Sequence, residues 1–474
     1  MGQEIGITQF TETDHARFLE KLQTETELLA ELIRRGELSS RGPLTGFELE
    51  GWLVYPDMSP APLNEAFLER YNDPASSAEL ARYNVEFNSP VLPLATTVLT
   101  DLKQELGDIQ ARARVVANSL GVELLLIGSL PTLREPHLSL SNLSDLNRYR
   151  LLNDRILASR RGQAIPLNIV GRQHLVALHE DVMPEAAATS FQLHWQIPLE
   201  DACRYYNAAL IASAPVVAIA ANSPFVFGTD LWAETRIALF EQAIPLGSYQ
   251  DGLHGPLHRV SFGTGFARAS IAEVFIENLE HFPVLLAYVS PTDPARFTHL
   301  KLHNGTIWLW NRPLVGADED GTPHIRLEHR PLPAGPTIPD MVANAALFYG
   351  LVESLASDID SPKLDFAQTR DNFYLAARHG LGARLIWQGK HLTAARLLAD
   401  RLLPKAREGL EHLGLGADDI GHYLGIIEAR NFNGQTGCEW QRRYISKHPG
   451  AFADMTSRYL EHQQSGKPVH EWSV

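Results

Sequence analysis

Four short segments of the chain alternate apolar residues with side chains that bind metal ions or phosphate, and they span residues 46–51, 84–88, 192–196 and 326–330. Successive side chains of a β-strand point to opposite faces of its sheet. As strands, the segments would place Glu48, Glu50, Asn84, Glu86, Asn88, Gln192, His194, Gln196, Arg326, Glu328 and Arg330 on one face. The other face would carry Phe47, Leu49, Val85, Phe87, Leu193, Trp195, Ile325 and Leu327. This pattern predicts a sheet whose polar face is an open active site.

Glu48 and Glu50 are the strongest pair, because two carboxylates at positions i and i+2 of a strand can bind neighbouring cations. Mg²⁺ prefers oxygen ligands, and substrate phosphates often complete its coordination. A single pair of this kind is more typical of the solvated outer face of an antiparallel sheet. The same arrangement recurs on the three other segments, and this repetition favours a metal or phosphate site.

Two further residues, His194 and Arg330, each admit two interpretations, and a third, Arg236, carries little functional signal by itself. His194 lies between a leucine and a tryptophan, which is typical of a hydrogen-bonded structural histidine, but its polar neighbours equally favour a ligand role. Arg330 presents a fixed, charged fork that suits phosphate or carboxylate, or it forms an ion pair with Glu328 or Glu86. Arg236 lies on a predicted helix, where most arginines are solvated.

The elements that would position these residues follow from hydrophobic periodicity. Helical patterns span residues 14–35 (capped by Thr13 or Asp14), 94–120, 147–159, 201–214 and 230–242, and further on 339–355, 392–413 and 420–430, with no further strand pairs after residue 336. In the apolar stretch 208–221 we expect a bend or a second element after Pro215. Residues 247–265 are rich in glycine and histidine and could form a mobile loop over the site.

We divide the chain into a helical segment (residues 1–40), a catalytic domain (41–357) and a helical region (358–474) that packs on it, with a boundary near 357–362. The fold class predicted is α+β, with an antiparallel sheet and helices on its outer face.

Composition narrows the function further. Among 474 residues, 41 are basic and 56 acidic, a net charge of −15 that argues against nucleic-acid binding and makes an anionic substrate dependent on a cation. Two cysteines, Cys203 and Cys438, favour a reducing cytoplasm, and the absence of a Cys-x-x-Cys pair argues against a thiolate zinc site. No signal peptide or membrane-spanning segment is apparent. P-loop, dinucleotide and serine-hydrolase motifs are absent, and Cys438 has no histidine partner in the sequence that would make it a nucleophile.

Together the motifs resemble glutamate–cysteine ligase family 2, the carboxylate–amine ligases of the glutamine-synthetase superfamily. The resemblance rests on 46–50, 86–88, 193–196, Arg236 with its apolar helix, and 327–332, in the order of the family. It implies a cradle-shaped antiparallel sheet that holds ATP and two or three Mg²⁺ (or Mn²⁺) ions. By position it implies the metal ligands Glu48, Glu50, Glu86, His194 and Glu328, with Arg330 on the transferring phosphate and Arg236 on a substrate carboxylate. Asn88, Gln192 and Gln196 would line the substrate pocket.

The predicted activity is ATP-dependent amide formation, in which the γ-carboxylate of glutamate becomes an acyl phosphate and joins an amine such as cysteine, as in glutathione biosynthesis. In this scheme Glu50, Glu328 and Arg330 are the catalytic residues, the partners are small molecules, and a homo-oligomer is compatible with the sequence. Two alternatives stay open: a metal-dependent amidase or hydrolase, and a non-catalytic nucleotide-binding regulatory relative.

Overall fold

The four polar-faced segments are neighbouring strands of one sheet in the computed structural model, which describes residues 6, 9–245, 250–251, 255–256, 258–358 and 364–474. The strand order is β15-β16-β8-β1-β3-β2, and β4 and β5 also pair with β1. The strands are β1 (Leu44–Val54), β2 (Ser76–Ala78), β3 (Asn84–Asn88), β4 (Leu92–Pro93), β5 (Glu123–Leu125), β8 (Phe191–Gln196), β15 (Asn311–Ala317) and β16 (Pro323–His329). Every pairing within this sheet is antiparallel, as predicted.

The apolar face of the sheet forms the core. Phe47, Leu193 and Trp195 are at most 2% exposed. The Trp195 ring meets Tyr205 of α5 and Tyr349 of α9 edge to face, with ring centroids 5.2 and 5.5 Å apart. Helices therefore cover one face of the sheet and leave the polar face for the site.

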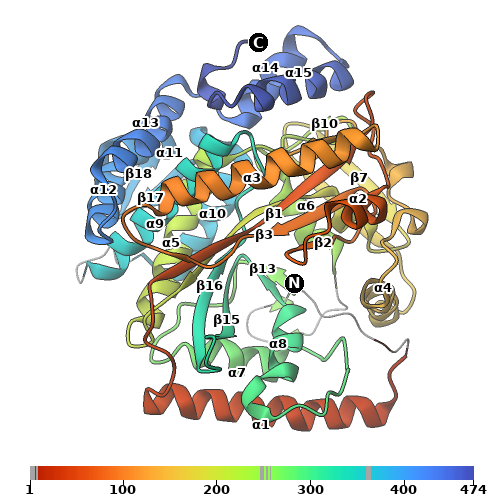
Figure 1. Cartoon of the computed structure of the whole chain (residues 1–474), viewed down its shortest axis with the longest axis vertical. Helices are drawn as coiled ribbons and strands as arrows, with labels where there is room; N and C mark the ends of the chain where they lie inside the picture. Colours follow the sequence, from red (N-terminus) through yellow and green to blue (C-terminus); the bar gives the residue numbers. More distant parts are fainter. Residues whose placement is uncertain (1–5, 7–8, 246–249, 252–254, 257, 359–363) are drawn as a thin grey trace.

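The described helices are α1 (Glu12–Arg35), α2 (Asn64–Tyr71), α3 (Val98–Ser119), α4 (Asn147–Ser159), α5 (Ala202–Ala220), α6 (Thr235–Ala243), α7 (Ala272–His281), α8 (Thr298–Gly305), α9 (Ile338–Ser357), α10 (Phe366–His379), α11 (Ala394–Leu397), α12 (Leu403–His412), α13 (Ala417–Asn433), α14 (Gly437–Lys447) and α15 (Phe452–Ser465). Helix α1 lies along one end of the molecule, and α14 and α15 lie at the opposite end (Figure 1). None of the described helices is both long and apolar enough to cross a membrane.

Helix α1 confirms the predicted N-terminal helix but begins earlier than expected. Its N-cap is Thr11, not Thr13 or Asp14, because the Thr11 hydroxyl accepts from the Asp14 amide while the Asp14 carboxylate accepts from the Thr11 amide. A buried contact of 2.6 Å between His299 of α8 and Glu25 fixes α1 to the body of the molecule.

Two expectations about local structure are wrong. Helix α5 runs without interruption through Pro215 to Ala220, because residues 208–220 are all buried and packing outweighs the lost hydrogen bond of the proline. After residue 336 the chain forms a hairpin, β17 (Arg384–Trp387) with β18 (Lys390–Thr393). Its turn holds Gln388 and Gly389 at positive φ, the backbone that a two-residue hairpin requires.

A second hairpin, β6 (Ile165–Val170) with β7 (His174–His179), was not expected from the sequence. The remaining short strands are β9 (Phe225–Val226), β10 (Thr229–Asp230), β11 (Gln250–Asp251), β12 (Gly255–Pro256), β13 (Val260–Ser261) and β14 (Trp308–Leu309). Part of the expected mobile loop at 247–265 (247–249, 252–254 and 257) and most of the expected boundary at 357–362 (359–362) lie outside the described residues. The division into three parts therefore stays a prediction.

Candidate active site

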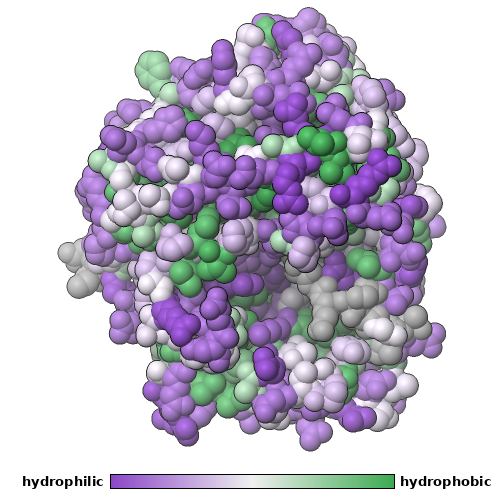
Figure 2. Space-filling view, in the orientation of Figure 1, coloured by the Kyte–Doolittle hydropathy of each residue, from purple (hydrophilic) through white to green (hydrophobic). Residues whose placement is uncertain are grey.

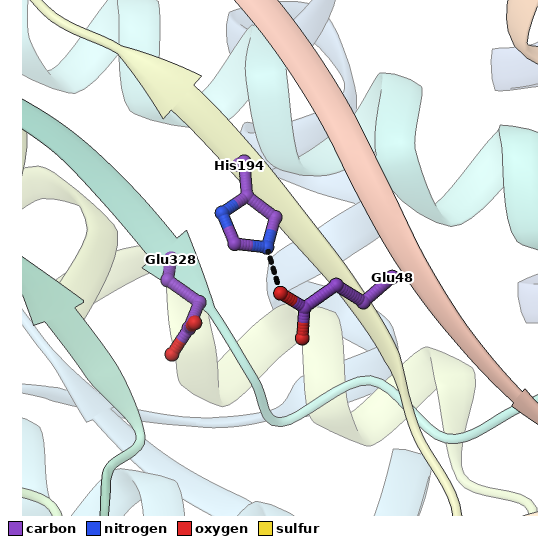
Figure 3. Close-up of side chains that lie close together, drawn as sticks. All are labelled: Glu48, His194 and Glu328. Carbon is purple, nitrogen blue, oxygen red and sulfur yellow. Dashed lines mark ion pairs between the residues drawn. The ribbon is translucent and has the colours of Figure 1, made fainter. Parts of the chain in front are cut away.

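Glu48, His194 and Glu328 meet on the polar face of the sheet, although they are far apart in the sequence. They come from the adjacent strands β1, β8 and β16, and Glu328 is the register partner of His194. The three side chains point toward one another (Figure 3), and one ligand atom from each lies within 4.8 Å of the others. One oxygen of Glu48 is 3.2 Å from Nε2 of His194.

The donor atoms of this cluster fit a cation. Oε2 of Glu48 and Nδ1 of His194 are buried, and no residue in the described part of the chain hydrogen-bonds to them. Buried polar atoms without a partner are costly, so they mark a place where a ligand is expected. Two carboxylates and one imidazole are suitable ligands for a divalent metal ion.

Two arginines hold the charge of Glu328. Arg312 donates two hydrogen bonds to its carboxylate, of 2.9 and 3.0 Å, and Arg330 donates a third of 3.1 Å. Burial alone would raise the pKa of Glu328, but the positive charges of Arg312 and Arg330 hold this pKa well below its usual range. Glu328 is therefore an ionised carboxylate at neutral pH, ready to bind a cation. Sequence reasoning missed Arg312, which is opposite Glu328 on β15.

A second acidic cluster lies beside the first and consists of Glu50, Glu79 and Glu86, whose ligand atoms are also within 4.8 Å of one another. Glu50 and Glu86 are register partners on β1 and β3. Glu79, which follows β2, was missed because it belongs to no alternating segment. Burial raises the pKa of Glu79 well above its usual value, and the charges of Glu86 and Glu50 raise it further.

The carboxylate of Glu50 also has a defined orientation. It accepts hydrogen bonds from the backbone amide and the hydroxyl of Ser190, both 2.7 Å, and from the side-chain amide of Gln192, 3.0 Å. Burial raises the pKa of Glu50, and the nearby negative charge of Glu86 raises it further. The hydrogen bond from the Ser190 hydroxyl lowers this pKa but does not outweigh them. The negative charges of the three carboxylates therefore repel one another, and a bound cation would relieve that repulsion.

Two pockets lie at these clusters. Pocket A is lined by Glu50, Glu185, Ala188, Ser190, Arg236, Phe240, Trp310 and Arg330. Pocket B, the roomier of the two, is lined by Leu44, Thr45, Gly46, Phe47, Glu48, Asn88, Ser89, Pro90, Val91, His194, Gln196, Ala317, His324 and Arg326. The face shown in Figure 2 is hollowed below its middle, in the same orientation as Figure 1.

Comparison with known proteins decides the family. The model of glutamate–cysteine ligase family 2 matches residues 44–461, which is most of the chain. This chain belongs to that family. It is therefore an ATP-dependent carbon–nitrogen ligase, as the sequence predicted. No curated protein sequence matches the chain.

Two solved structures show the same fold as this family member. A glutamate–cysteine ligase from Francisella tularensis, in complex with AMP, is 12% identical with a TM-score of 0.55 and covers 92% of this chain and 96% of its own. A bifunctional glutathione synthetase from Pasteurella multocida is 11% identical with a TM-score of 0.51; the match covers 95% of this chain and 55% of that one. The predicted α+β fold, with the antiparallel cradle of glutamine-synthetase-like ligases, is confirmed.

The structure brings most of the predicted site residues of the family together. Glu50, Arg236 and Arg330 line pocket A. Asn88 and Gln196 line pocket B beside Glu48 and His194, so they are not in one pocket with Arg236. Gln192 lines neither pocket. It is fully buried, and it joins the site by accepting from Arg330 and donating to Glu50.

Arg236 is the second residue of α6 and is 4% exposed. Its guanidinium donates to the backbone carbonyls of Pro331 and Arg330 at 3.0 and 3.1 Å, and it is 3.3 Å from Glu234. These contacts fix the guanidinium at the wall of pocket A. Cys438, in contrast, lies in α14 and lines neither pocket, and burial raises the pKa of its thiol, so it is a poor nucleophile.

Proposed function

We propose that this ligase activates the γ-carboxylate of glutamate with ATP and joins it to an amine such as cysteine, in the cytoplasm, as a step of glutathione biosynthesis. The observation that supports this most is that each pocket contains part of one carboxylate cluster: Glu48 and His194 line pocket B, and Glu50 lines pocket A together with Arg330. Pocket B would hold the nucleotide, and pocket A would hold the amino acid. The phosphates would then lie over the clusters.

The metal ions are proposed to bind at the two clusters, with Glu48, His194 and Glu328 in one and Glu50, Glu79 and Glu86 in the other. Mg²⁺ or Mn²⁺ at these residues would neutralise the phosphates of ATP, which the carboxylates alone would repel.

The chain's own residues would orient the reacting groups. Arg330 is held by Glu328 and Gln192, so its fork is fixed before substrate binds and can stabilise charge on the transferring phosphoryl group. Arg236, at the wall of pocket A, would bind a carboxylate of the acid substrate.

Bond changes follow from this placement. An oxygen of the γ-carboxylate attacks the γ-phosphorus of ATP, and the bond from phosphorus to ADP breaks. The amine, in its neutral form, then attacks the carbonyl carbon of the acyl phosphate, and the carbon–oxygen bond to phosphate breaks. The nitrogen gives up one proton, which the released phosphate can take, and the amide keeps the other.

The test is an ADP-release assay with glutamate and a panel of amines, with and without Mg²⁺. We expect ADP only when acid, amine and metal are all present. Glu50→Gln and Glu328→Gln should abolish turnover and leave the circular dichroism spectrum unchanged. Amide cleavage without ATP would instead identify a hydrolase, and nucleotide binding without turnover on any amine would identify a regulatory relative.

A further inference from the structure

Glu185 is an acidic residue of pocket A that the proposed reaction does not use. It lies in the short 3-10 helix Met183–Ala187, which follows the β6–β7 hairpin. The same pocket is lined by Arg236, Arg330 and Trp310. Glu185 therefore borders the space in which the amino acid substrate is proposed to bind.

The other carboxylates around pocket A have hydrogen-bond donors. Glu50 accepts from Ser190 and Gln192, as described above. Glu241 accepts hydrogen bonds from the indole of Trp310, which lines the pocket, and from the hydroxyl of Tyr374, each 2.8 Å long. These carboxylates are occupied by the protein itself.

Glu185 differs from them, because no residue of the described chain donates a hydrogen bond to its carboxylate. Burial raises its pKa to about 8, and the nearby charge of Glu50 also raises it, while Arg330 lowers it. A half-buried carboxylate without a donor in the described chain is disfavoured in its ionised form unless a ligand supplies a cation. Its position at a pocket rather than in the core indicates that the ligand is a substrate.

The charges of pocket A suit an amino acid. Arg236 and Arg330 can each bind a carboxylate or phosphate, and they leave an ammonium group without an acceptor. Glu50 has three hydrogen-bond donors and belongs to an acidic cluster that would bind a cation. Among the lining residues, Glu185 is the carboxylate that is free to accept from an ammonium group.

We propose that Glu185 is a specificity residue that binds the ammonium group of an amino substrate in pocket A. This rests on the proposed ligase function and deepens it. The ammonium group has two sources, the α-amino group of the acid substrate or the amine that attacks the acyl phosphate. The contact with Glu185 is the same for both sources. Substrates that lack the ammonium group distinguish one source from the other.

The experiment compares Glu185→Gln with wild type and with Glu180→Gln, an exposed carboxylate of the same segment that loses the same charge. One arm varies the acid, glutamate against glutarate, which lacks the α-amino group. The other arm varies the amine, cysteine against hydroxylamine, which is uncharged at neutral pH. ADP release is the readout in both arms. Because the folded protein disfavours the ionised form of Glu185, we expect the Tm of Glu185→Gln to equal or exceed that of wild type.

We expect Glu185→Gln to raise one KM by roughly ten- to 150-fold, the value of a hydrogen bond to a charged group. If the source is the acid, the KM of glutamate rises and that of glutarate does not. If the source is the amine, the KM of cysteine rises and hydroxylamine is used as before. Glu180→Gln should match wild type in both arms.

Three results would overturn the assignment. They are unchanged KM values in Glu185→Gln, an equal loss with charged and uncharged substrates, or the same loss in Glu180→Gln. If Glu185→Gln were unstable, Glu185→Asp, which keeps the charge, should restore discrimination between the charged and uncharged substrate. Wild-type enzyme that releases no ADP with any pair would instead refute the ligase function itself.

Discussion

Replacing Glu79 by glutamine should make the metal-free protein more stable and its response to Mg²⁺ weaker. Glu79 lies within 4.8 Å of carboxylate oxygens of Glu50 and Glu86. Its pKa in the folded protein is raised well above the usual value by burial and by those two charges. The stability that such a group contributes is fully present below its unfolded pKa and is lost as pH rises through the folded pKa. The metal-free protein should therefore lose stability as pH rises above about 4.5, and Glu79→Gln should reduce that loss.

The magnitude follows from the geometry. Two ionised carboxylates 4.8 Å apart repel by about 3.5 kcal/mol at an effective dielectric constant of about 20. The unfolding entropy of a 474-residue chain is about 1 kcal/mol/K, so each kcal/mol changes Tm by about 1 °C. At alkaline pH we expect Glu79→Gln to raise the metal-free Tm by about 3 °C. Mg²⁺ at a hundred times its Kd should stabilise wild type by about 2.7 kcal/mol, and the variant by clearly less.

The assay is thermal unfolding at pH 6 and pH 8 with and without Mg²⁺, for wild type, Glu79→Gln and the control Glu69→Gln. Glu69 lies on α2 and is exposed, so Glu69→Gln removes the same charge at a place outside the cluster. A metal-free Tm at pH 8 that falls in Glu79→Gln, or a full Mg²⁺ response in that variant, would refute the reasoning.

Three other substitutions test further parts of the structure. Arg330→Lys keeps the charge but loses the planar fork, so kcat in the ADP-release assay should fall roughly 100-fold or more, with a smaller change in the KM of ATP; an unchanged kcat would exclude Arg330 from phosphoryl transfer. Arg430→Met leaves the buried Asp340 without its partner at 2.7 Å and should cost about 3–5 kcal/mol in denaturant unfolding, without altering any KM. Cys438→Ala should keep the activity, because the buried thiol is outside both pockets, and loss of activity in a folded variant would contradict this.

The alternation of residues predicted the polar strands because side-chain direction in a strand depends only on local backbone geometry. Glu48 and Glu50 had to share a face once residues 44–54 formed a strand, and the apolar partners Phe47 and Leu49 had to be buried. The order of the motifs then predicted the family. For the same reason Glu79 could not be found, since it follows a three-residue strand with no alternating pattern.

Local signals were misinterpreted where packing or turn chemistry outweighed them. Pro215 suggested a break, but α5 is buried along its length, so tertiary contacts kept it helical. Gln388 and Gly389 marked a hairpin turn within a region dominated by helical patterns. The sequence therefore did contain a hairpin signal, and the glycine at position 389 was its most specific residue.

The sequence by itself determined which side chains face the same way on each strand, how much charge the molecule carries, and the family to which it belongs, because these depend on local geometry, composition and motif order. Only the tertiary structure decided that Glu328 stands opposite His194, that Arg312 holds Glu328 ionised, and that Glu185 lacks a donor at the wall of pocket A. Strand order and register bring distant residues within a few ångströms, and charge, burial and pKa depend on those distances.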